Sequence, residues 1–507
     1  MTDRRSFLRT AGQVVGQVLL DKPLGKRLSM VGMVALLGVA CSAQTPNATE
    51  SAAGSRLEKA YRFQQGGWTY VHLEGSPSEI GFQHGYLLAP EIADALDAIK
   101  LFDTHQTQRD WEFFRKTARE MLWPHIDPEY RQELQGIADG VKAHGVNLHG
   151  VDLDVYDIVA LNAFEEVPDY YVPWLDKREK SAKAPKLAAP GDCSAFIATG
   201  AYTKDHQIVI AHSNWTSYLA GERWVIVFDI LPQHGQRILM DGFPGVITSD
   251  DDFGLNAAGI MITETTITQF EGWDPNGKPE FMRSRKALQY ARSIDDYVRI
   301  IKEGNNGGYA NDWLIGDRKT GEIAYLELGL KNTPLWRTKD GYFVSSNFPR
   351  DPKLIREETS GFDPNDRSSS MNARHARAEE LMKQEKGKID VTTAQQFLSD
   401  HDDSFESDKP QPNERSLCGH VDASSRGVKE WDWAPYDPAG SVQGKATDSK
   451  MAAGMSFVAR AGHPCGADFL AADFLERHPE FSWQKPLLRD MKAGPWTTFQ
   501  AGQKVGQ

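Results

Sequence analysis

The chain of 507 residues lacks several features that would place it in a class at once. Its body contains no block of lysine and arginine, and the net charge is −13, which excludes an extended nucleic-acid surface. Beyond one apolar run near the N-terminus, no stretch has the length of a membrane span. No phosphate loop and no dinucleotide fingerprint occurs, so we expect no cofactor. With 40% hydrophobic and 25% charged residues, the composition is that of an ordinary globular protein.

Metal-binding patterns are also scarce. The acidic stretch that starts at His401 lacks the alternation and the glycine of an EF-hand and predicts a solvated loop. Cys418 and His420 are close enough in sequence for one metal-binding pair, but no second pair has zinc spacing. The sequence alone therefore predicts no metal site.

The chain has only four cysteines: Cys41, Cys193, Cys418 and Cys465. If Cys41 is lipidated or removed, an odd number remains, and one of them is expected to be a free thiol with a function. Cys418 and Cys465 can pair and leave Cys193 alone, or both can stay buried thiols; the sequence leaves the two alternatives open.

The N-terminus predicts export from a bacterial cytoplasm. Arg4-Arg5-Ser6-Phe7-Leu8 resembles a twin-arginine signal, and residues 30–40 form an apolar run of signal-peptide length that ends in small residues. Cys41 fits a lipid-anchor cysteine, although Leu37 stands four residues before it and the usual pattern has leucine three before. Lipidation at Cys41, simple cleavage and an uncleaved anchor are the alternatives, and each places the protein in the periplasm or cell envelope.

The rest of the chain divides by pattern. We expect a targeting segment at 1–43, a tether at 44–57, a mainly helical segment at 58–192 and a catalytic part at 193–507, the last two forming one integrated domain. Helices are predicted at 78–102, 128–144 and 155–164, with Asp127 and Pro128 as helix-start signals. Residues 177–190, rich in Lys, Ala and Pro, predict an exposed linker that is prone to proteolysis.

After this linker the pattern changes to short strands. Apolar and β-branched runs predict strands at 194–199, 207–212, 224–231, 259–265, 313–317, 323–328 and 343–346. Helices are expected between them at 279–290, 294–303, 372–384 and 392–399. Blocks of strands between blocks of helices indicate an α+β fold, and helix pairs beside several short strands suit a four-layer α-β-β-α sandwich.

The chemistry centres on Cys193, which opens a predicted strand just after the linker. If the chain is cut between Asp192 and Cys193, the new α-amino group can act as the base for the thiol, because its pKa of about 7.7–8.0 leaves it partly neutral. Nucleophile and base then belong to one residue in a fixed geometry. A buried cysteine at the start of a core strand is the simpler interpretation of this motif.

Further motifs stand in this order along the chain: Asp192-Cys193-Ser194-Ala195, Ile210-Ala211-His212-Ser213-Asn214-Trp215, Gly242-Phe243-Pro244-Gly245, Gly259 to Ile267, and Tyr309-Ala310-Asn311-Asp312-Trp313. Together they resemble the phospholipase B-like family, within the wider group of N-terminal-nucleophile hydrolases. The resemblance covers roughly residues 68–470, and the helix around Arg374 is closer to the penicillin acyltransferase (peptidase C45-like) branch.

The resemblance implies the sandwich fold of that group and a role for each matching residue. Cys193 is the expected nucleophile, and Asn311 the expected oxyanion-hole donor. His212 and Asn214 are expected on the neighbouring strand, near the sulfur or amine; relatives carry an aspartate near Asn214 to hold the α-ammonium, so that role is open here. The remaining expectations are Arg374 holding the centre or the substrate, and Trp215 and Thr265 lining the pocket.

The function that follows is cleavage of acyl amide or ester bonds through a thioester at Cys193, on an acylated small molecule or lipid, with the cleaved fragments staying associated. An acyltransferase that uses an amine in place of water is one alternative. A non-catalytic lipid-binding lipoprotein, tethered to the membrane through Cys41, is another.

Overall fold

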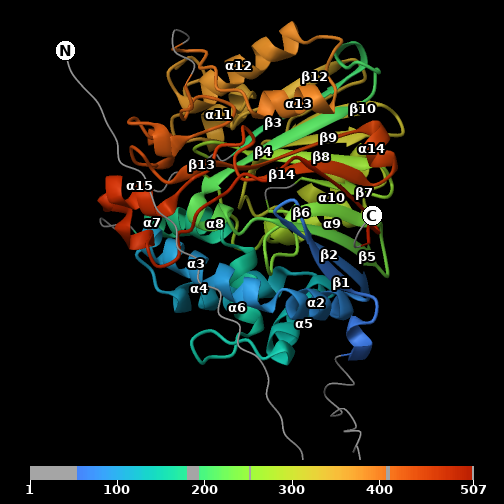
Figure 1. The fold of residues 1–507 in the computed structure, drawn as a ribbon, viewed down its shortest axis with the longest axis vertical. Helices are drawn as coiled ribbons and strands as arrows, with labels where there is room; N and C mark the ends of the chain where they lie inside the picture. The colour runs from blue at the N-terminus through green and yellow to red at the C-terminus, as the bar shows by residue number, and fades with distance from the viewer. Residues whose placement is uncertain (1–53, 180–192, 251–252, 407–410, 505–507) are drawn as a thin grey trace, which may run out of the picture. The chain divides into compact units, whose positions relative to one another are not determined.

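Two β-sheets organise the computed structural model, which describes residues 54–179, 193–250, 253–406 and 411–504 (Figure 1). The first sheet has nine strands in the order β1-β2-β5-β6-β7-β8-β9-β10-β11, and the second has six in the order β12-β3-β4-β13-β14-β15. Neighbouring strands are antiparallel except β2 and β5, which are parallel. The described residues belong to one compact unit. The predicted targeting motifs and Cys41 lie outside them.

The strands of the nine-stranded sheet come from both sides of Cys193 in the sequence. They are β1 (Tyr61–Gln65), β2 (Trp68–Gly75), β5 (Ile226–Pro232), β6 (Ile238–Gly242), β7 (Gly254–Asn256), β8 (Ile260–Thr266), β9 (Asn311–Asp317), β10 (Glu322–Glu327) and β11 (Leu335–Thr338). The six-stranded sheet is made of β3 (Cys193–Thr199), β4 (Val209–Ser217), β12 (Gly341–Ser345), β13 (Ala439–Asp448), β14 (Ser456–Ala461) and β15 (Thr497–Gln500).

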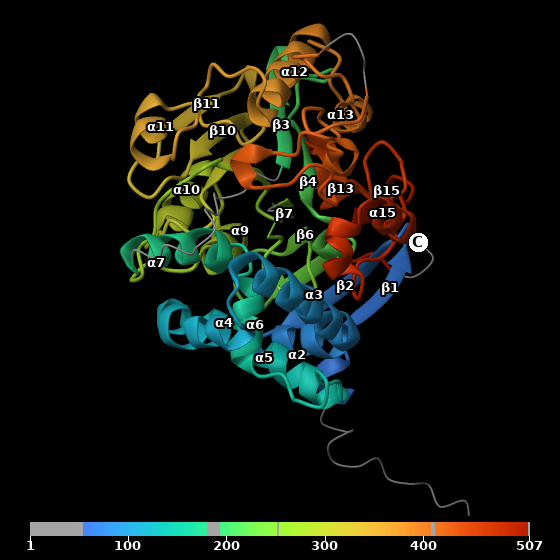
Figure 2. The ribbon, with the colours of Figure 1, turned by 90° about the vertical axis from the view of Figure 1, so that its left-hand side faces the viewer.

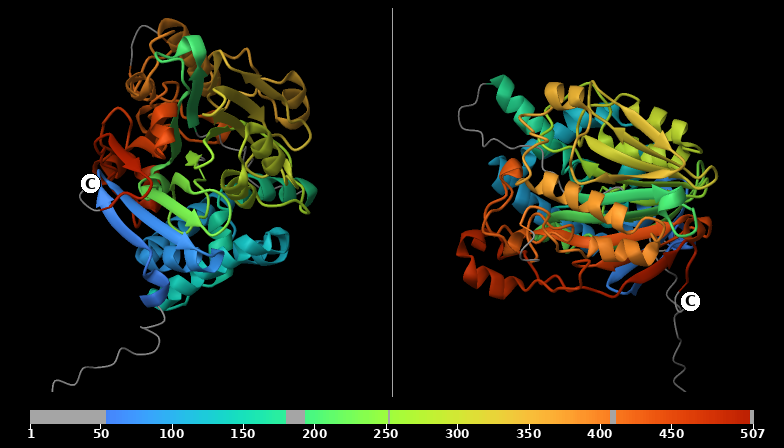
Figure 3. Two further views of the ribbon diagram at one scale, coloured as in Figure 1. Left: turned by 90° about the vertical axis from the view of Figure 1, so that its right-hand side faces the viewer. Right: turned by 90° about the horizontal axis from the view of Figure 1, so that it is seen from above.

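Helices lie along both sheets (Figures 2 and 3). The N-terminal group is α2 (Pro77–Leu87), α3 (Ala89–Thr107), α4 (Trp111–Thr117), α5 (Pro128–His144), α6 (Val155–Asn162) and α7 (Val172–Glu179). The later helices are α8 (Tyr218–Gly221), α9 (Glu280–Tyr290), α10 (Ile294–Lys302), α11 (Pro352–Glu358), α12 (Ser370–Gln384), α13 (Val391–Leu398), α14 (Ser449–Ala453) and α15 (Ala471–Arg477). None of the described helices is both long and apolar enough to cross a bilayer.

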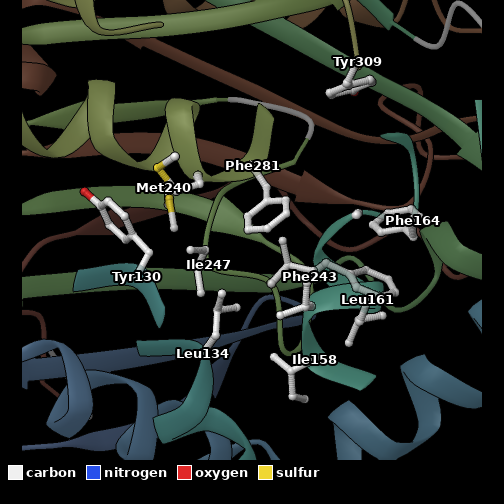
Figure 4. Packing of buried hydrophobic residues seen from close by; sticks show 14 of the residues in the cluster. Tyr130, Leu134, Ile158, Leu161, Phe164, Met240, Phe243, Ile247, Phe281 and Tyr309 are labelled. Carbon is white, nitrogen blue, oxygen red and sulfur yellow. The ribbon is translucent and has the colours of Figure 1, made fainter. Parts of the chain in front are cut away.

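The three largest apolar clusters of the described residues fill the spaces between these elements. Residues that alternate along the strands, such as Ile197, Ile210 and Leu314, pack between the two sheets. On its other face the six-stranded sheet packs against α12 and α13. The nine-stranded sheet packs its other face against α5, α6, α9 and α10 through the largest core, whose side chains are seen in Figure 4. The expected α+β class is therefore confirmed.

Several predicted boundaries need correction. The helix expected at 78–102 is two helices, broken at Leu88. Pro90 stands in the first turn of α3 and has no N–H, so it cannot continue α2. Pro128 begins α5 as predicted, but the carboxylate of Asp127 makes no capping bond and accepts a hydrogen bond from Lys286 Nζ instead (2.7 Å). Of the expected linker, 177–179 belong to α7 and 180–190 lie outside the described residues.

Candidate active site around Cys193

Cys193 is the first residue of β3 and is fully buried. Strand β4 runs antiparallel beside it, with Asn214 opposite Cys193 and His212 opposite Ala195. Because side chains two residues apart point to the same face of a strand, His212 and Asn214 share one face of β4. Ile210, two positions further along, lies in the core between the sheets, so this face is turned toward the nine-stranded sheet. The two polar residues predicted from the sequence thus stand beside the cysteine.

The sulfur of Cys193 is surrounded by buried polar atoms. Asn214 Oδ1 and Glu264 Oε1 each lie 4.0 Å from its Sγ. Ligand atoms of Cys193, His212 and Glu264 all lie within 4.8 Å of one another. The hydroxyl of Tyr309 donates a hydrogen bond to Glu264 Oε1 (3.4 Å), and burial together with this carboxylate raises the pKa of Tyr309 well above its usual value. The phenol therefore stays protonated and is a donor at neutral pH.

Arg374 on α12 fixes the backbone at the start of β3. Its Nη1 donates to the carbonyl oxygen of Cys193 (2.6 Å) and to Ser194 Oγ (3.0 Å), and its Nη2 donates to Asn347 Oδ1 (2.8 Å). The guanidinium also lies over the ring of Trp215, 4.3 Å from the centroid. A buried arginine with this many partners holds Cys193 in one position.

Asn311 is the first residue of β9 and is fully buried. Its register partner on β8 is Thr266, so Glu264 is its diagonal neighbour on the same face. Both the Oδ1 and the Nδ2 of Asn311 are buried without a hydrogen-bond partner among the described residues. An unsatisfied buried amide is costly in a native protein, so this amide is available to a water molecule or a ligand.

The two residues expected to line the pocket are both buried. Trp215 follows Asn214 on β4 and packs beneath Arg374. Thr265 shares a hydrogen bond with Ser345 (Oγ1 to Oγ, 2.6 Å), and its Oγ1 accepts from the N–H of Asn347 (3.2 Å). Both side chains therefore lie inside the protein and contact other residues of the site.

A cavity of about 430 Å³ lies beyond the end of β8. Its walls combine the aromatic side chains of Tyr170, Trp174 and Phe270 with the basic side chains of Lys177 and Arg178. Lys177 Nζ forms an ion pair with Glu271 (2.8 Å). The cavity lining does not include Cys193. The lining also includes Asp169 and Glu271, so the cavity combines aromatic walls with charged groups of both signs.

Comparison with known proteins finds similarity to one family. A phospholipase B family profile matches residues 91–324. Phospholipase B-like 1 of Bos taurus is 24% identical over 313 residues, which is 54% of this chain and 56% of the relative. Its human counterpart is 25% identical over 266 residues, 47% of each chain. Phospholipase B-like protein F of Dictyostelium discoideum is 30% identical over 143 residues, 26% of this chain and 25% of the relative.

The chain is similar to the phospholipase B-like family over this region. It spans about half the length of the two mammalian relatives that it matches. The matched region includes Cys193, the strand that carries His212 and Asn214, and the start of β9 with Asn311. Arg374 lies beyond it.

The site also contains residues for which the sequence predicted no role. They are Glu264, which lies within the motif from Gly259 to Ile267, together with Tyr309 and Asn347. A signal for Glu264 was present, because an isolated carboxylate within the apolar strand β8 is rare unless it is paired or functional. Asn347 gave no such signal; its contact with Arg374 arises only when α12 packs on the sheet.

Two groups of described residues have metal-ligating side chains close together. Cys193, His212 and Glu264 form one, and this group suits thiol chemistry as well as a metal ion. The second consists of two cysteines and two histidines outside the Cys193 site.

Proposed function

We propose that this protein is a hydrolase of acyl ester or amide bonds, with Cys193 as an N-terminal nucleophile that cleavage after Asp192 exposes. The observation that carries the proposal is the placement of Cys193 as the first residue of a buried core strand, with Asn214 Oδ1 and Glu264 Oε1 both 4.0 Å from its sulfur. The relatives' printed name, phospholipase B-like, supports hydrolysis of acyl esters. Two sheets packed face to face, with helices on their outer faces, support the sandwich fold of the N-terminal-nucleophile hydrolases.

The first step is processing of the chain. The sulfur of Cys193 attacks the carbonyl carbon of Asp192, and the peptide nitrogen leaves as the α-amine of Cys193. Water then hydrolyses the resulting thioester and releases Asp192 with a free carboxylate. Arg374 supports this step because it holds the Cys193 carbonyl oxygen at 2.6 Å and so fixes the residue while the bond before it breaks.

In the second step the α-amine takes the proton from the thiol, and the thiolate attacks the acyl carbon of the substrate. The oxyanion that forms accepts a hydrogen bond from Nδ2 of Asn311, whose buried amide has no other partner among the described residues. The α-ammonium returns its proton to the leaving alcohol or amine. Water, deprotonated by the α-amine, then hydrolyses the thioester and restores the thiol.

Glu264 can take the role of the aspartate that relatives carry near position 214, which is to hold the α-ammonium group. An α-ammonium next to Cys193 needs a nearby anion to stabilise its charge inside the protein. Glu264 Oε1 is 4.0 Å from the sulfur of that same residue, whereas Asn214 carries no charge. We therefore assign the anionic role to Glu264 and leave Asn214 as a neutral partner of the thiol.

The sheet topology supports lasting association of the two fragments. Strand β2 comes before the cleavage point and β5 after it, and the two pair in parallel over seven residues, from Thr69↔Ile226 to Gly75↔Pro232. The largest core contains side chains from both fragments. Cleavage after Asp192 leaves these contacts in place.

Intact-mass analysis of the mature protein, before and after incubation at mildly acidic pH, tests the proposal. We expect a fragment that begins with Cys193 and a Cys193→Ala variant that stays whole and inactive. Asp205→Ala, an exposed change in the loop between β3 and β4, is the matched control and is expected to be cut like the parent chain. Activity from a chain that stays uncut under all conditions would contradict the N-terminal-nucleophile mechanism.

One observation favours a second candidate, a thiol hydrolase that needs no cleavage. Cys193, His212 and Glu264 have their ligand atoms within 4.8 Å of one another, the composition of a thiol–imidazole–carboxylate site. In that mechanism His212 is the base, so His212→Ala abolishes hydrolysis by an uncut chain. In the N-terminal-nucleophile mechanism the same change leaves the α-amine in place as the base, and residual activity is expected.

A further inference from the structure

Two cysteines and two histidines meet outside the Cys193 site. His401, Cys418, His420 and Cys465 each offer one ligand atom, and these four atoms all lie within 4.8 Å of one another. His420 Nε2 is 3.6 Å from the sulfur of Cys418 and 3.6 Å from the sulfur of Cys465. All three described cysteines, including these two, are free thiols in the structure.

The cluster is assembled by the fold. His401 follows α13, and Cys418 is held near it because the N–H of Cys418 donates to the carbonyl oxygen of Asp400 (3.0 Å). His420 is tied by a β-bridge to the start of β13. Cys465 lies in a turn that follows β14. The sequence showed only the Cys418–His420 pair, since its two partners come from other segments.

The distances match the coordination of a soft divalent ion. Zinc binds thiolate sulfur at about 2.3 Å and imidazole nitrogen at about 2.0–2.1 Å in a tetrahedron. This geometry separates a sulfur ligand from a nitrogen ligand by about 3.5 Å. Both sulfur-to-nitrogen distances at His420 are 3.6 Å.

Groups around the ligands are arranged as a metal site requires. Nδ1 of His420, on the opposite side of the ring from the two sulfurs, lies 3.8 Å from Asp422 Oδ1. That carboxylate in turn accepts a hydrogen bond from the hydroxyl of Tyr218 (2.8 Å). The backbone N–H of Ala467 donates to the sulfur of Cys465 (3.5 Å), and Nε2 of His401 is buried without a hydrogen-bond partner among the described residues. Carboxylates beside metal-binding histidines and N–H groups beside thiolates orient such ligands.

We propose that His401, Cys418, His420 and Cys465 bind one Zn²⁺ ion in a structural site. Four protein ligands complete the tetrahedron and leave no position for a substrate. Binding deprotonates both thiols, and the two released protons pass to the solvent. The Cys2His2 set favours zinc over the hard cations that prefer oxygen ligands.

Gly419, which stands between the ligands Cys418 and His420, connects the zinc site to the candidate active site. A Cβ atom at Gly419 would lie 2.1 Å from ring carbons of Trp215, so the segment 418–420 packs directly on that ring. Trp215 lies beneath Arg374, which holds the carbonyl oxygen of Cys193. The zinc site thus supports Trp215 and Arg374, which pack behind Cys193. The zinc proposal does not depend on Cys193 being the nucleophile.

Elemental analysis of the purified full chain tests the proposal directly. We expect about one zinc per chain, as for a closed four-ligand site. Cys465→Ser and His401→Ala are expected to lose the metal and to lower the Tm, while the matched controls Cys193→Ala and His149→Ala, the latter an exposed histidine, keep it. A chain that carries no zinc after growth and refolding with Zn²⁺ would overturn the proposal.

A second measurement remains informative if the ligand variants fail to fold. Exchange of the parent chain with Co²⁺ is expected to give the visible bands of a tetrahedral site and sulfur-to-cobalt charge transfer, both absent when the chain is first treated with a strong chelator. Thiol titration of the denatured, chelated chain is expected to find Cys418 and Cys465 reduced. A Cys418–Cys465 disulfide, as an exported protein can form, would overturn the proposal.

Discussion

At the scale of single residues, the environment of Cys193 is set by partners of different kinds. Arg374 holds its backbone, the carboxyl group of Glu264 lies 4.0 Å from its sulfur, and the buried amide of Asn311 is the proposed oxyanion donor. Of these three side chains, only that of Asn311 makes no hydrogen bond among the described residues. A donor of this kind can gain its bond when negative charge develops on the substrate, which is the condition for transition-state stabilisation.

Asn311→Ala is expected to reduce kcat by about 10²–10³-fold with little change in KM, because the amide acts on the oxyanion and not on the bound substrate. Steady-state kinetics of the processed enzyme on a short acyl ester measures this change. The matched control is Asn276→Ala, in an exposed loop, which is expected to match the parent enzyme. An equal loss in both variants, or a change in KM alone, would argue against the oxyanion role.

At the scale of elements, glycines bring α2 and α5 into close contact. A Cβ atom at Gly81 would lie 1.9 Å from the carbonyl oxygen of Glu133, and one at Gly85 would lie 2.0 Å from that of Ile137. Gly140 on α5 is equally close to the carbonyl oxygen of Phe82 (2.3 Å). The backbones of the two helices therefore touch, and no other residue type fits at these positions.

Gly85→Ala is expected to destabilise the protein by about 2–3 kcal/mol, because the added methyl group must push the two backbones apart. Thermal unfolding followed by circular dichroism measures the decrease in Tm. Gly54→Ala is the matched control, since a Cβ atom there meets nothing within 4 Å and φ is not in the left-handed region. We expect a lower Tm for Gly85→Ala and an unchanged or higher Tm for Gly54→Ala; equal Tm values for the two variants would show that the helices tolerate the added methyl group.

His84 makes the same helix pair sensitive to acid. Its Nε2 accepts a hydrogen bond from the N–H of Gly245 (3.0 Å), and burial lowers the pKa of His84 from 6.5 to about 3. Because the folded protein binds this proton less readily than the unfolded chain, the neutral ring stabilises the fold above pH 6.5. That contribution is lost progressively as the pH falls from 6.5 toward 3.

The free energy of unfolding of the parent protein, relative to His84→Gln, is therefore expected to fall by up to about 3 kcal/mol between pH 6.5 and pH 4. Glutamine keeps an acceptor for Gly245 but does not titrate, and the difference between the two proteins removes the contribution of all other groups. Urea unfolding at a series of pH values provides the measurement. A difference that stays constant over this range would show that His84 does not titrate as its burial requires.

At the scale of the whole molecule, a buried ion pair joins the two sheets. Lys445 on β13 lies 2.9 Å from Asp241 on β6, and both side chains are fully buried. Ser249 Oγ also donates to Asp241 (3.0 Å). Lys445 stands opposite His212 in the six-stranded sheet, so the ion pair continues the row of polar residues that leads to Cys193.

Lys445→Met is expected to cost about 3–5 kcal/mol, because it leaves the carboxylate of Asp241 buried without its cation. The double variant Lys445→Met/Asp241→Leu is expected to recover most of this loss, since it removes both charges. Tm values of the single and double variants, in a double-mutant cycle with Asp241→Leu, give the coupling. Additive losses would show that the pair does not join the sheets energetically.

Much of the fold was readable in the sequence because it depends on local patterns. The period of apolar residues, with Pro128 at its start, located α5 at Pro128–His144, and apolar, β-branched runs located the core of β8 and β9. Short or edge strands such as β1, β7 and β15 were missed, since their pairing depends on distant partners and not on their own residues.

The sequence by itself also determined the resemblance to the phospholipase B-like family, the nucleophile candidate and its polar neighbours on β4, because these are carried by short motifs with fixed spacing. Only the tertiary structure decided which distant groups join them. Glu264 meets Cys193 by the packing of one sheet on the other, and Arg374 by the packing of α12. His401 and Cys465 meet the pair at 418 and 420 through loop closure alone. Such tertiary contacts produce no periodic pattern in the sequence, because they depend on the topology of the whole fold.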